Sequence, residues 1–192
     1  MGLAGVGAHS AMQRGFVIGI VGAECSGKTQ LALALQARLA AETHDAVVVS
    51  EALREFCTEH GRTPHQAEQT DIAREQSQRI TTAAESHALV VADTTALMVA
   101  VYSDLVFSDT SLYVQAERDH RRCDVTLLTA LDLPWQSDGV QRDGPHVREP
   151  VDALIRAALQ RMSQPYAVVA GTGDARMQSA WAVVLHALPP SR

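Results

Sequence analysis

One glycine-rich segment, from Gly22 to Thr29, reads Gly-Ala-Glu-Cys-Ser-Gly-Lys-Thr and fits the phosphate-binding pattern G-x-x-x-x-G-K-[ST] in full. Glycines let the backbone fold closely around phosphates, and backbone N–H groups at a helix start meet the anionic oxygens. Lys28 is expected to act on the β- and γ-phosphates and Thr29 to offer a hydroxyl to Mg²⁺. The expected contacts with ATP are Gly22, Glu24, Cys25, Ser26, Gly27, Lys28 and Thr29.

Cys25 lies inside this segment, where the start of a helix tends to lower a thiol pKa. A redox role is one interpretation, and a small residue that fits the turn is the other. The other two cysteines are Cys57 and Cys123, and the three show neither a CxxC pair nor metal-ligand spacing. We therefore expect free thiols in a reducing compartment.

Two acids stand at the expected carboxyl ends of strands: Asp93 ends the apolar run 88–93, and Glu51 follows the run 46–50. Ligands of open parallel sheets lie beyond these ends. Asp93 could take the proton from an attacking hydroxyl or hold hydrated Mg²⁺, and Glu51 could accept hydrogen bonds from a sugar. A place at a helix N-terminus is the alternative for each. Arg54 is a candidate for the same substrate pocket or for a solvated helix face.

The segment from Pro134 to Glu149 is rich in glycine, proline and charged residues, which predicts a long loop. A mobile lid with arginines suits phosphoryl transfer, because it excludes water and brings positive charge to the migrating group. Arg142 and Arg148 are the catalytic candidates, and an ordinary charged surface loop is the alternative. Trp135 at the edge of the loop would either stack on a substrate ring or fill the core.

A second glycine-rich turn, from Gly171 to Arg176, follows the apolar run 166–170. Its backbone groups could lie along the adenine edge of a nucleotide, so Gly171 and Arg176 are candidates for nucleotide binding. A simple connection between a strand and a helix is the alternative.

Continuous apolar runs predict five buried strands, at residues 16–21, 46–50, 88–93, 124–129 and 166–170. Helices are expected at residues 27–42, 52–60, 64–85, 96–102, 111–122, 150–162 and 175–188. Apolar strands that alternate with helices are typical of a parallel sheet covered on both faces. The sequence therefore predicts an α/β fold in a single domain, residues 16–192, after a disordered leader at 1–15.

The composition is that of an ordinary globular protein, with 46% hydrophobic residues among 192 and a net charge of −6. The basic residues are scattered, so we expect no binding to nucleic acid or to an anionic membrane. The sequence has no apolar run of about 18 residues, which predicts no membrane span. Its N-terminus has no long apolar stretch of the signal-peptide kind, and a cytoplasmic protein is expected.

Four segments together indicate a family: 22–29, Ser50-Glu51-Ala52-Leu53-Arg54-Glu55, Asp93-Thr94-Thr95 and 132–139. With them, residues 16–176 resemble the ribosylnicotinamide kinase domain of the bifunctional bacterial NAD-salvage and regulatory protein, within the AAA-type P-loop ATPases and kinases. The resemblance implies a three-layer P-loop fold with strand order 2-3-1-4-5. It also implies that ATP and Mg²⁺ phosphorylate the 5′-hydroxyl of nicotinamide riboside to give nicotinamide mononucleotide.

The same resemblance implies roles for individual residues. Glu51 would meet the ribose, Asp93 would serve as base or Mg²⁺ partner, and Arg142 and Arg148 would act from a lid at about 134–149. Trp135 and Asp138 belong to the Pro-Trp-x-x-Asp-Gly segment and are candidates for substrate binding. The chain is too short to include the adenylyltransferase and DNA-binding parts of the bifunctional protein, so we expect neither NAD synthesis nor operator binding.

Two classes of function remain open from the sequence. The first is a kinase for nicotinamide riboside, another nucleoside or a small hydroxyl compound. The second is a regulatory module that hydrolyses ATP slowly and signals to a partner; a closed sugar pocket or a large exposed apolar patch would favour it. The expected partner is a small-molecule substrate, and a homodimer is possible by analogy with similar kinases.

Overall fold

The computed structural model describes residues 14–43, 45–136 and 144–189. A parallel five-stranded sheet lies at the centre, in the order β2-β3-β1-β4-β5. Its strands are β1 (Phe16–Val21), β2 (Ala46–Val49), β3 (Leu89–Asp93), β4 (Val125–Thr129) and β5 (Ala167–Val169). The α/β fold predicted from the sequence, and the strand order implied by the resemblance, are both confirmed.

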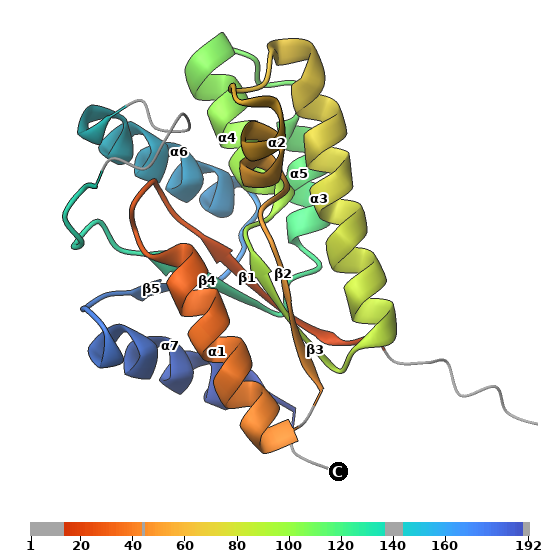
Figure 1. Ribbon diagram of the computed structural model, residues 1–192, viewed down its shortest axis with the longest axis vertical. Coiled ribbons are helices and arrows are strands. Elements are labelled where there is room, and N and C mark those ends of the chain that lie inside the picture. The colour runs from red at the N-terminus through yellow and green to blue at the C-terminus, as the bar shows by residue number, and fades with distance from the viewer. Residues whose placement is uncertain (1–13, 44, 137–143, 190–192) are drawn as a thin grey trace, which may run out of the picture.

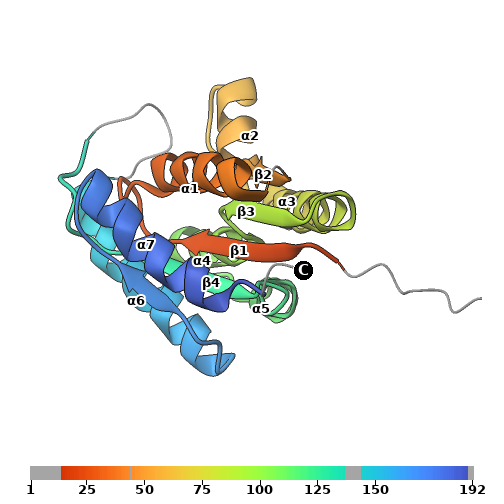
Figure 2. The same ribbon diagram turned by 90° about the horizontal axis from the view of Figure 1, so that it is seen from below.

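Helices cover both faces of the sheet and give the molecule three layers (Figures 1 and 2). One face carries α1 and α7, and the other carries α3, α4, α5 and α6. The short helix α2 packs against α3. The bounds are α1 (Lys28–Thr43), α2 (Ala52–His60), α3 (Gln66–Ser86), α4 (Ala96–Phe107), α5 (Tyr113–His120), α6 (Arg148–Arg161) and α7 (Asp174–Ala187).

The register of the strands brings the chemistry-bearing segments to one edge of the sheet. Ile20 of β1 lies opposite Asp93 of β3, and Val49 of β2 lies opposite Ala92. Because parallel strands end at the same edge, the loop after β1, the turn after β2 and Asp93 emerge together. The carboxyl edge therefore carries all the segments that the sequence singles out before residue 95.

Two predicted boundaries are wrong. Helix α4 continues to Phe107 instead of ending at Tyr102, because Ser103 is buried and the helix closes only at Ser108, which adopts a left-handed conformation. The predicted loop 134–149 ends too late in the sequence. A short 3-10 helix lies at Pro145–Val147, and α6 begins directly after it at Arg148.

The start of the folded chain and its cysteines add two observations. Arg14, assigned to the leader by the sequence, donates two hydrogen bonds of 2.8 and 2.9 Å to the Asp124 carboxylate. None of the three cysteines forms a disulfide bond. Burial raises the pKa of the Cys123 thiol to about 12, so this thiol stays protonated.

Within the described residues, no helix has the length and apolarity needed to cross a bilayer.

His120 lies in a buried hydrogen-bonded chain that supports the start of α4. Its Nδ1 lies 2.9 Å from Thr95 Oγ1, and its Nε2 lies 3.0 Å from Thr126 Oγ1 on β4. The ring is 1% exposed, and burial lowers its pKa from 6.5 to about 4. His120 is therefore neutral in the folded protein over the physiological range.

We expect this neutral histidine to make folding pH-dependent. Between pH 6.5 and 4 the imidazole of His120 binds a proton in the unfolded chain but not in the folded one. The free energy of unfolding therefore falls as the pH falls. The loss due to His120 should reach about 2 kcal/mol at pH 5 relative to pH 8. Urea unfolding at both pH values should show this loss, and His120→Gln should reduce it by that amount. An identical pH dependence in the two proteins would contradict the assignment.

Candidate functional site

The loop between β1 and α1 forms a tight cradle that only glycine allows at two positions. A Cβ on Gly22 would lie 1.9 Å from Thr129 Oγ1. Gly27 has φ +78°, and a Cβ there would lie 2.9 Å from Leu133 Cδ1. These close approaches explain why the sequence has glycine at both ends of the loop.

Ser26 braces the cradle from inside. Its side chain is 1% exposed, and its Oγ lies 2.6 Å both from Ala23 O and from Thr129 Oγ1. The hydroxyl of Ser26 therefore holds the loop against β4, which leaves its backbone N–H as the group that can face a phosphate.

Lys28 is the single lysine among 16 lysine and arginine residues. Its Nζ donates a hydrogen bond of 2.9 Å to Ala23 O across the loop. Burial lowers the pKa of the Lys28 ammonium below its ordinary value, and the carboxylates of Glu51 and Asp93 oppose that shift. The ammonium is thus held where phosphate oxygens would replace its carbonyl partner.

A pocket of about 560 Å³ opens over the cradle. Its walls come from the phosphate loop, the start of α1, α2 and the segment after β4. The lining residues are Cys25, Ser26, Gly27, Lys28, Thr29, Gln30, Arg54, Leu133, Pro134 and Gln136. The backbone N–H groups and the ammonium give this pocket the charge that a triphosphate needs.

A second pocket of about 360 Å³ lies between the phosphate loop, α2, the start of α3 and the end of α4. Its wall is mostly apolar, with a few polar groups. The lining residues are Glu24, Cys25, Lys28, Leu53, Arg54, Cys57, Arg62, Thr63, Pro64, His65, Gln69, Tyr102, Val106 and Phe107. Cys25, Lys28 and Arg54 line both pockets, so the two cavities meet at these residues.

Neither of the two acids at the strand ends caps a helix with its carboxylate. Asp93 is 3% exposed, its Oδ1 has no hydrogen-bond partner in the described part of the chain, and Thr95 occupies the N-cap of α4. Glu51 occupies the N-cap of α2 without a capping side-chain bond. Its carboxylate accepts instead from Arg54 Nε at 3.2 Å. Oδ1 of Asp93 is therefore open to other chemistry, whereas Glu51 is paired with Arg54, and neither acid is among the residues that line the two pockets.

The arginines around the second pocket have carboxylate partners. Arg54 pairs with Glu51, and Arg62 donates two hydrogen bonds of 2.7 and 2.8 Å to Glu68. The Arg62 guanidinium holds the pKa of Glu68 at about 2. Arg62 also lies over the ring of Phe56 and so anchors the connection between α2 and α3.

The residues at the cradle suit a magnesium ion. Mg²⁺ in kinases takes oxygen ligands and is held by one or two protein groups together with substrate phosphates and water. Thr29 offers a hydroxyl in the first pocket, and Asp93 offers a carboxylate oxygen that is buried without a partner among the described residues. That same part of the chain contains no group of three or more His, Cys, Asp or Glu side chains placed to hold a metal alone.

Arg176 and Gly171 form a rigid turn after β5. The Arg176 guanidinium pairs with Asp132 and donates to the carbonyls of Gly171 and Val169 at 2.9 and 3.2 Å. Asp132 also accepts from the Gly171 N–H at 2.5 Å. These contacts occupy the Arg176 side chain, so it shapes the turn from within rather than presenting its charge to a nucleotide.

The predicted lid residues have different outcomes. Arg142 and Asp138 lie outside the described residues. Arg148 is not a loop residue: it begins α6, is 8% exposed and donates to Leu133 O at 2.9 Å. The predicted loop ends early for a local reason. Gly144, with φ +106°, and Pro145 start a helical turn before residue 149, where the charged residues predicted the loop to end.

One hydrogen bond connects the start of that segment to the cradle. Cys25 Sγ donates to Gln136 O at 3.1 Å, and Cys25 adopts a left-handed conformation with φ +51°. Trp135 is half-buried, and its Nε1 has no hydrogen-bond partner among the described residues. The tryptophan belongs to none of the described hydrophobic clusters.

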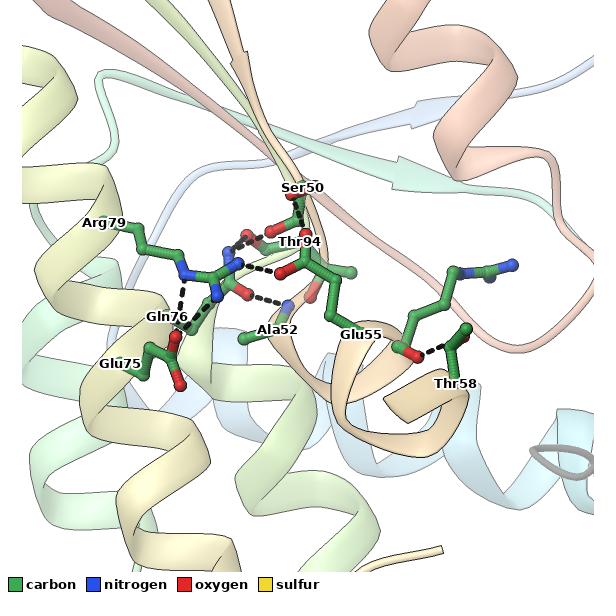
Figure 3. A network of polar contacts seen from close by, with 9 residues as sticks. Ser50, Ala52, Glu55, Thr58, Glu75, Gln76, Arg79 and Thr94 are labelled. Carbon is green, nitrogen blue, oxygen red and sulfur yellow. Dashed lines mark hydrogen bonds and ion pairs between the residues drawn. The ribbon is translucent and has the colours of Figure 1, made fainter. Parts of the chain in front are cut away.

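Two buried glutamines of α3 were missed in the sequence. Gln76 is 2% exposed and bonds to the turns that carry Glu51 and Asp93 (Figure 3). Gln69 is 5% exposed, lines the second pocket, and leaves its Oε1 without a partner in the described chain. Their spacing of seven residues puts both on one helix face, which was the signal available within a polar, glutamine-rich stretch.

A parallel sheet in this order, with the phosphate-binding loop between β1 and α1, defines a P-loop nucleotide-binding protein of the kinase-like fold. A family model described as an AAA domain matches residues 17–176. The chain belongs to this family. No curated protein sequence matches the chain significantly.

Solved structures support the same fold. The NadR protein in complex with NR has a TM-score of 0.69 and 18% identity, over 93% of this chain and 53% of that one. The NadR protein with NAD and AMP-PNP has a TM-score of 0.68 and 17% identity, over 93% and 51%. Thymidylate kinase from Ehrlichia chaffeensis gives 0.64 and 12%, over 90% and 98%. The chain thus spans about half the length of the two NadR structures.

Proposed function

We propose that this protein is an ATP-dependent kinase that phosphorylates a hydroxyl of a nucleoside-like acceptor. The acceptor we propose is nicotinamide riboside, whose 5′-hydroxyl would become the phosphate ester of nicotinamide mononucleotide in NAD salvage. The observation that carries the proposal is the meeting of two pockets at Lys28, Cys25 and Arg54. A module that only binds and slowly hydrolyses ATP needs the first pocket but not the second.

Asp93 and Glu51 supply the chemistry on the acceptor side. Asp93 would take the proton of the attacking hydroxyl as that oxygen bonds to the γ-phosphorus and the bond to the β-phosphate oxygen breaks. Its burial beside Lys28 keeps water from competing for the carboxylate. Glu51 would accept hydrogen bonds from the ribose hydroxyls and so orient the acceptor.

Lys28 and Arg54 supply positive charge at the point of transfer. Lys28 would hold the β- and γ-phosphates, and Arg54 reaches the boundary of the two pockets from α2. Mg²⁺, when held by the Thr29 hydroxyl, would neutralise charge on the phosphate oxygens, and Asp93 is the alternative ligand if it does not take the proton. Arg54 would thereby take the role that the sequence analysis gave to Arg142 and Arg148.

The acceptor pocket favours a nucleoside over a nucleoside monophosphate. A phosphate on the acceptor would need a cation of its own, yet Arg62 is paired with Glu68, and Arg54, paired with Glu51, is the cation proposed for the transferred group. The apolar wall with Tyr102 and Phe107 suits a planar ring. The NadR structure with NR supports the choice of riboside, and the thymidylate kinase neighbour makes other nucleosides the alternative acceptors.

The proposal is tested with purified protein, ATP and Mg²⁺, with and without nicotinamide riboside, and with a panel of other nucleosides. We expect riboside-dependent ADP formation and a product with the mass of the mononucleotide. Turnover of another nucleoside but not of the riboside would overturn the riboside assignment. Binding of ATP with no phosphorylated product from any acceptor would overturn the kinase assignment and favour the regulatory module.

Gln69 gives a prediction in which stability and substrate binding move in opposite directions. A buried amide oxygen without a partner costs about 1–3 kcal/mol, so Gln69→Leu should leave the protein as stable as the wild type or more stable. Because Gln69 lines the second pocket, we propose that its Oε1 accepts a hydrogen bond from the acceptor. Loss of this bond should raise KM for the acceptor about tenfold. The matched control is Gln78→Leu on the exposed face of α3. An unchanged KM would contradict the role of Gln69.

A further inference from the structure

The strands that carry the two acids separate just before the acids begin. The ladder between β2 and β3 ends at the pair Val49 and Ala92. Beyond it, β2 leads through Ser50 into α2, whereas β3 ends at Asp93 and leads towards α4. Backbone groups at such a divergence lose their strand partners and need others if they are buried. The relative position of Glu51 and Asp93 therefore depends on what replaces the ladder.

The side chain of Gln76 occupies this place. Its Oε1 accepts from Ala52 N at 2.7 Å, and its Nε2 donates to Ser50 O at 3.2 Å and to Thr94 O at 3.1 Å. Figure 3 shows the amide reaching from α3 between the two turns. One amide thus uses its acceptor and both its donor hydrogens on the residues that flank Glu51 and follow Asp93.

We propose that Gln76 is a positioning residue for phosphoryl transfer. By holding the turn around Glu51 to the chain after Asp93, it fixes the group that orients the ribose relative to the group that takes the proton. This inference rests on the proposed kinase function. Gln76, Glu51 and Asp93 are all absent from the residues that line the two pockets. Gln76 bonds to the turns that carry the two acids, so it acts through their placement and not on the substrate.

A second set of contacts surrounds this clamp but is too exposed to replace it. Ser50 Oγ donates to Glu55, whose other oxygen accepts from Arg79 at 2.5 Å, and Arg79 also pairs with Glu75 (Figure 3). The side chains of Glu55 and Glu75 are 48% and 55% exposed. Exposed pairs of this kind contribute little and are screened by salt. The buried amide of Gln76 is therefore the main link between the turn around Glu51 and the chain after Asp93.

The decisive variant is Gln76→Glu, which keeps the shape of the side chain. A carboxylate still accepts from Ala52 N but repels the carbonyl oxygens of Ser50 and Thr94. When protonated, the introduced carboxyl regains one donor. The carbonyl oxygens and the neighbouring acids Glu51 and Asp93 disfavour its charged form, so its pKa should be raised; Glu55 and Arg79 are the nearest charged groups of the outer set.

We expect Gln76→Glu to lower kcat for riboside phosphorylation about 10²-fold at pH 8, as for a small misplacement of reacting groups. KM for ATP should stay within about twofold of the wild-type value, and part of the lost kcat should return at pH 6. Gln78→Glu makes the same charge change on the exposed side of α3 and should behave as the wild type.

Two results would overturn the positioning role. The first is a wild-type kcat with an unaltered pH profile in Gln76→Glu. The second is an equal fall of kcat/KM for ATP and for the acceptor, with no recovery of kcat at pH 6. Amide hydrogen exchange at Ala52 gives a readout that needs no acceptor, and it should be faster in Gln76→Glu. If the wild type phosphorylates no acceptor, the proposed function fails. Unchanged exchange at Ala52 would then reject the clamp separately.

Discussion

Replacing Asp93 by asparagine is expected to lower phosphoryl transfer to the acceptor by about 10²- to 10⁴-fold. The amide keeps the shape of the side chain but cannot take a proton from the hydroxyl. Asp93 is buried at the end of β3, and its Oδ1 has no competing partner in the described part of the chain. The ATP pocket is lined by other residues, so ATP binding should persist.

The measurement compares kcat for riboside phosphorylation with the affinity for ATP in the presence and in the absence of Mg²⁺. Asp71→Asn is the matched control, because Asp71 is an exposed acid paired with Arg74 on α3. Transfer within a few-fold of the wild type in Asp93→Asn would remove Asp93 from the mechanism. A large loss of Mg²⁺-dependent ATP affinity, with transfer lowered in proportion, would assign Asp93 to the metal rather than to the proton.

Lys28→Ala is expected to lower turnover about 10²- to 10³-fold, the usual cost of removing one charged donor from a developing anion. It should also weaken ATP binding, since no other lysine exists in the sequence. Lys28→Arg should not restore activity. A guanidinium is planar and wider than an ammonium, and the cradle is already close-packed around Gly22 and Gly27.

The single lysine also allows a direct measurement of its charge. Protein labelled with ¹⁵N-lysine should give one side-chain signal, and its titration should show a pKa below the ordinary value of 10.5 in the free protein. Phosphate oxygens favour the charged ammonium, so ATP should raise that pKa and bind with proton uptake at alkaline pH. A pKa that does not respond to ATP would contradict contact between Lys28 and the phosphates.

Most of the fold could be predicted because the strands are continuous aliphatic runs. Residues such as Val90, Val91 and Leu127 are completely buried, and a strand covered on both faces needs apolar side chains at every position. The order of the strands could not be derived from periodicity, because all five runs look alike. It came from the resemblance, which uses the spacing of the motifs.

The site was predictable where backbone geometry restricts the residue type. Gly22 and Gly27 are such positions, since any Cβ would collide with Thr129 or Leu133. Asp93 was singled out as a candidate because it ends an apolar run. Arg148 was assigned to the loop because charge pattern alone cannot show that Gly144 and Pro145 begin a helix.

The buried glutamines of α3 could not be recognised from the sequence. Gln69 and Gln76 lie in a helix with many polar residues, where glutamine usually faces solvent. Only the packing of α3 against the sheet reveals that this face is buried. The pairing of Arg176 with Asp132 was hidden for a related reason, since the two residues are far apart in sequence and the pair depends on the fold.

The central claim is that the γ-phosphoryl group is transferred to an alcohol and not to water. A single-turnover reaction with γ-³²P-labelled ATP, Mg²⁺, excess enzyme and nicotinamide riboside tests it directly. The account predicts that the label appears in an organic monophosphate, at a rate that depends on the riboside and on Asp93. Label found only in inorganic phosphate, at the same rate with and without the riboside or any other nucleoside, would contradict it.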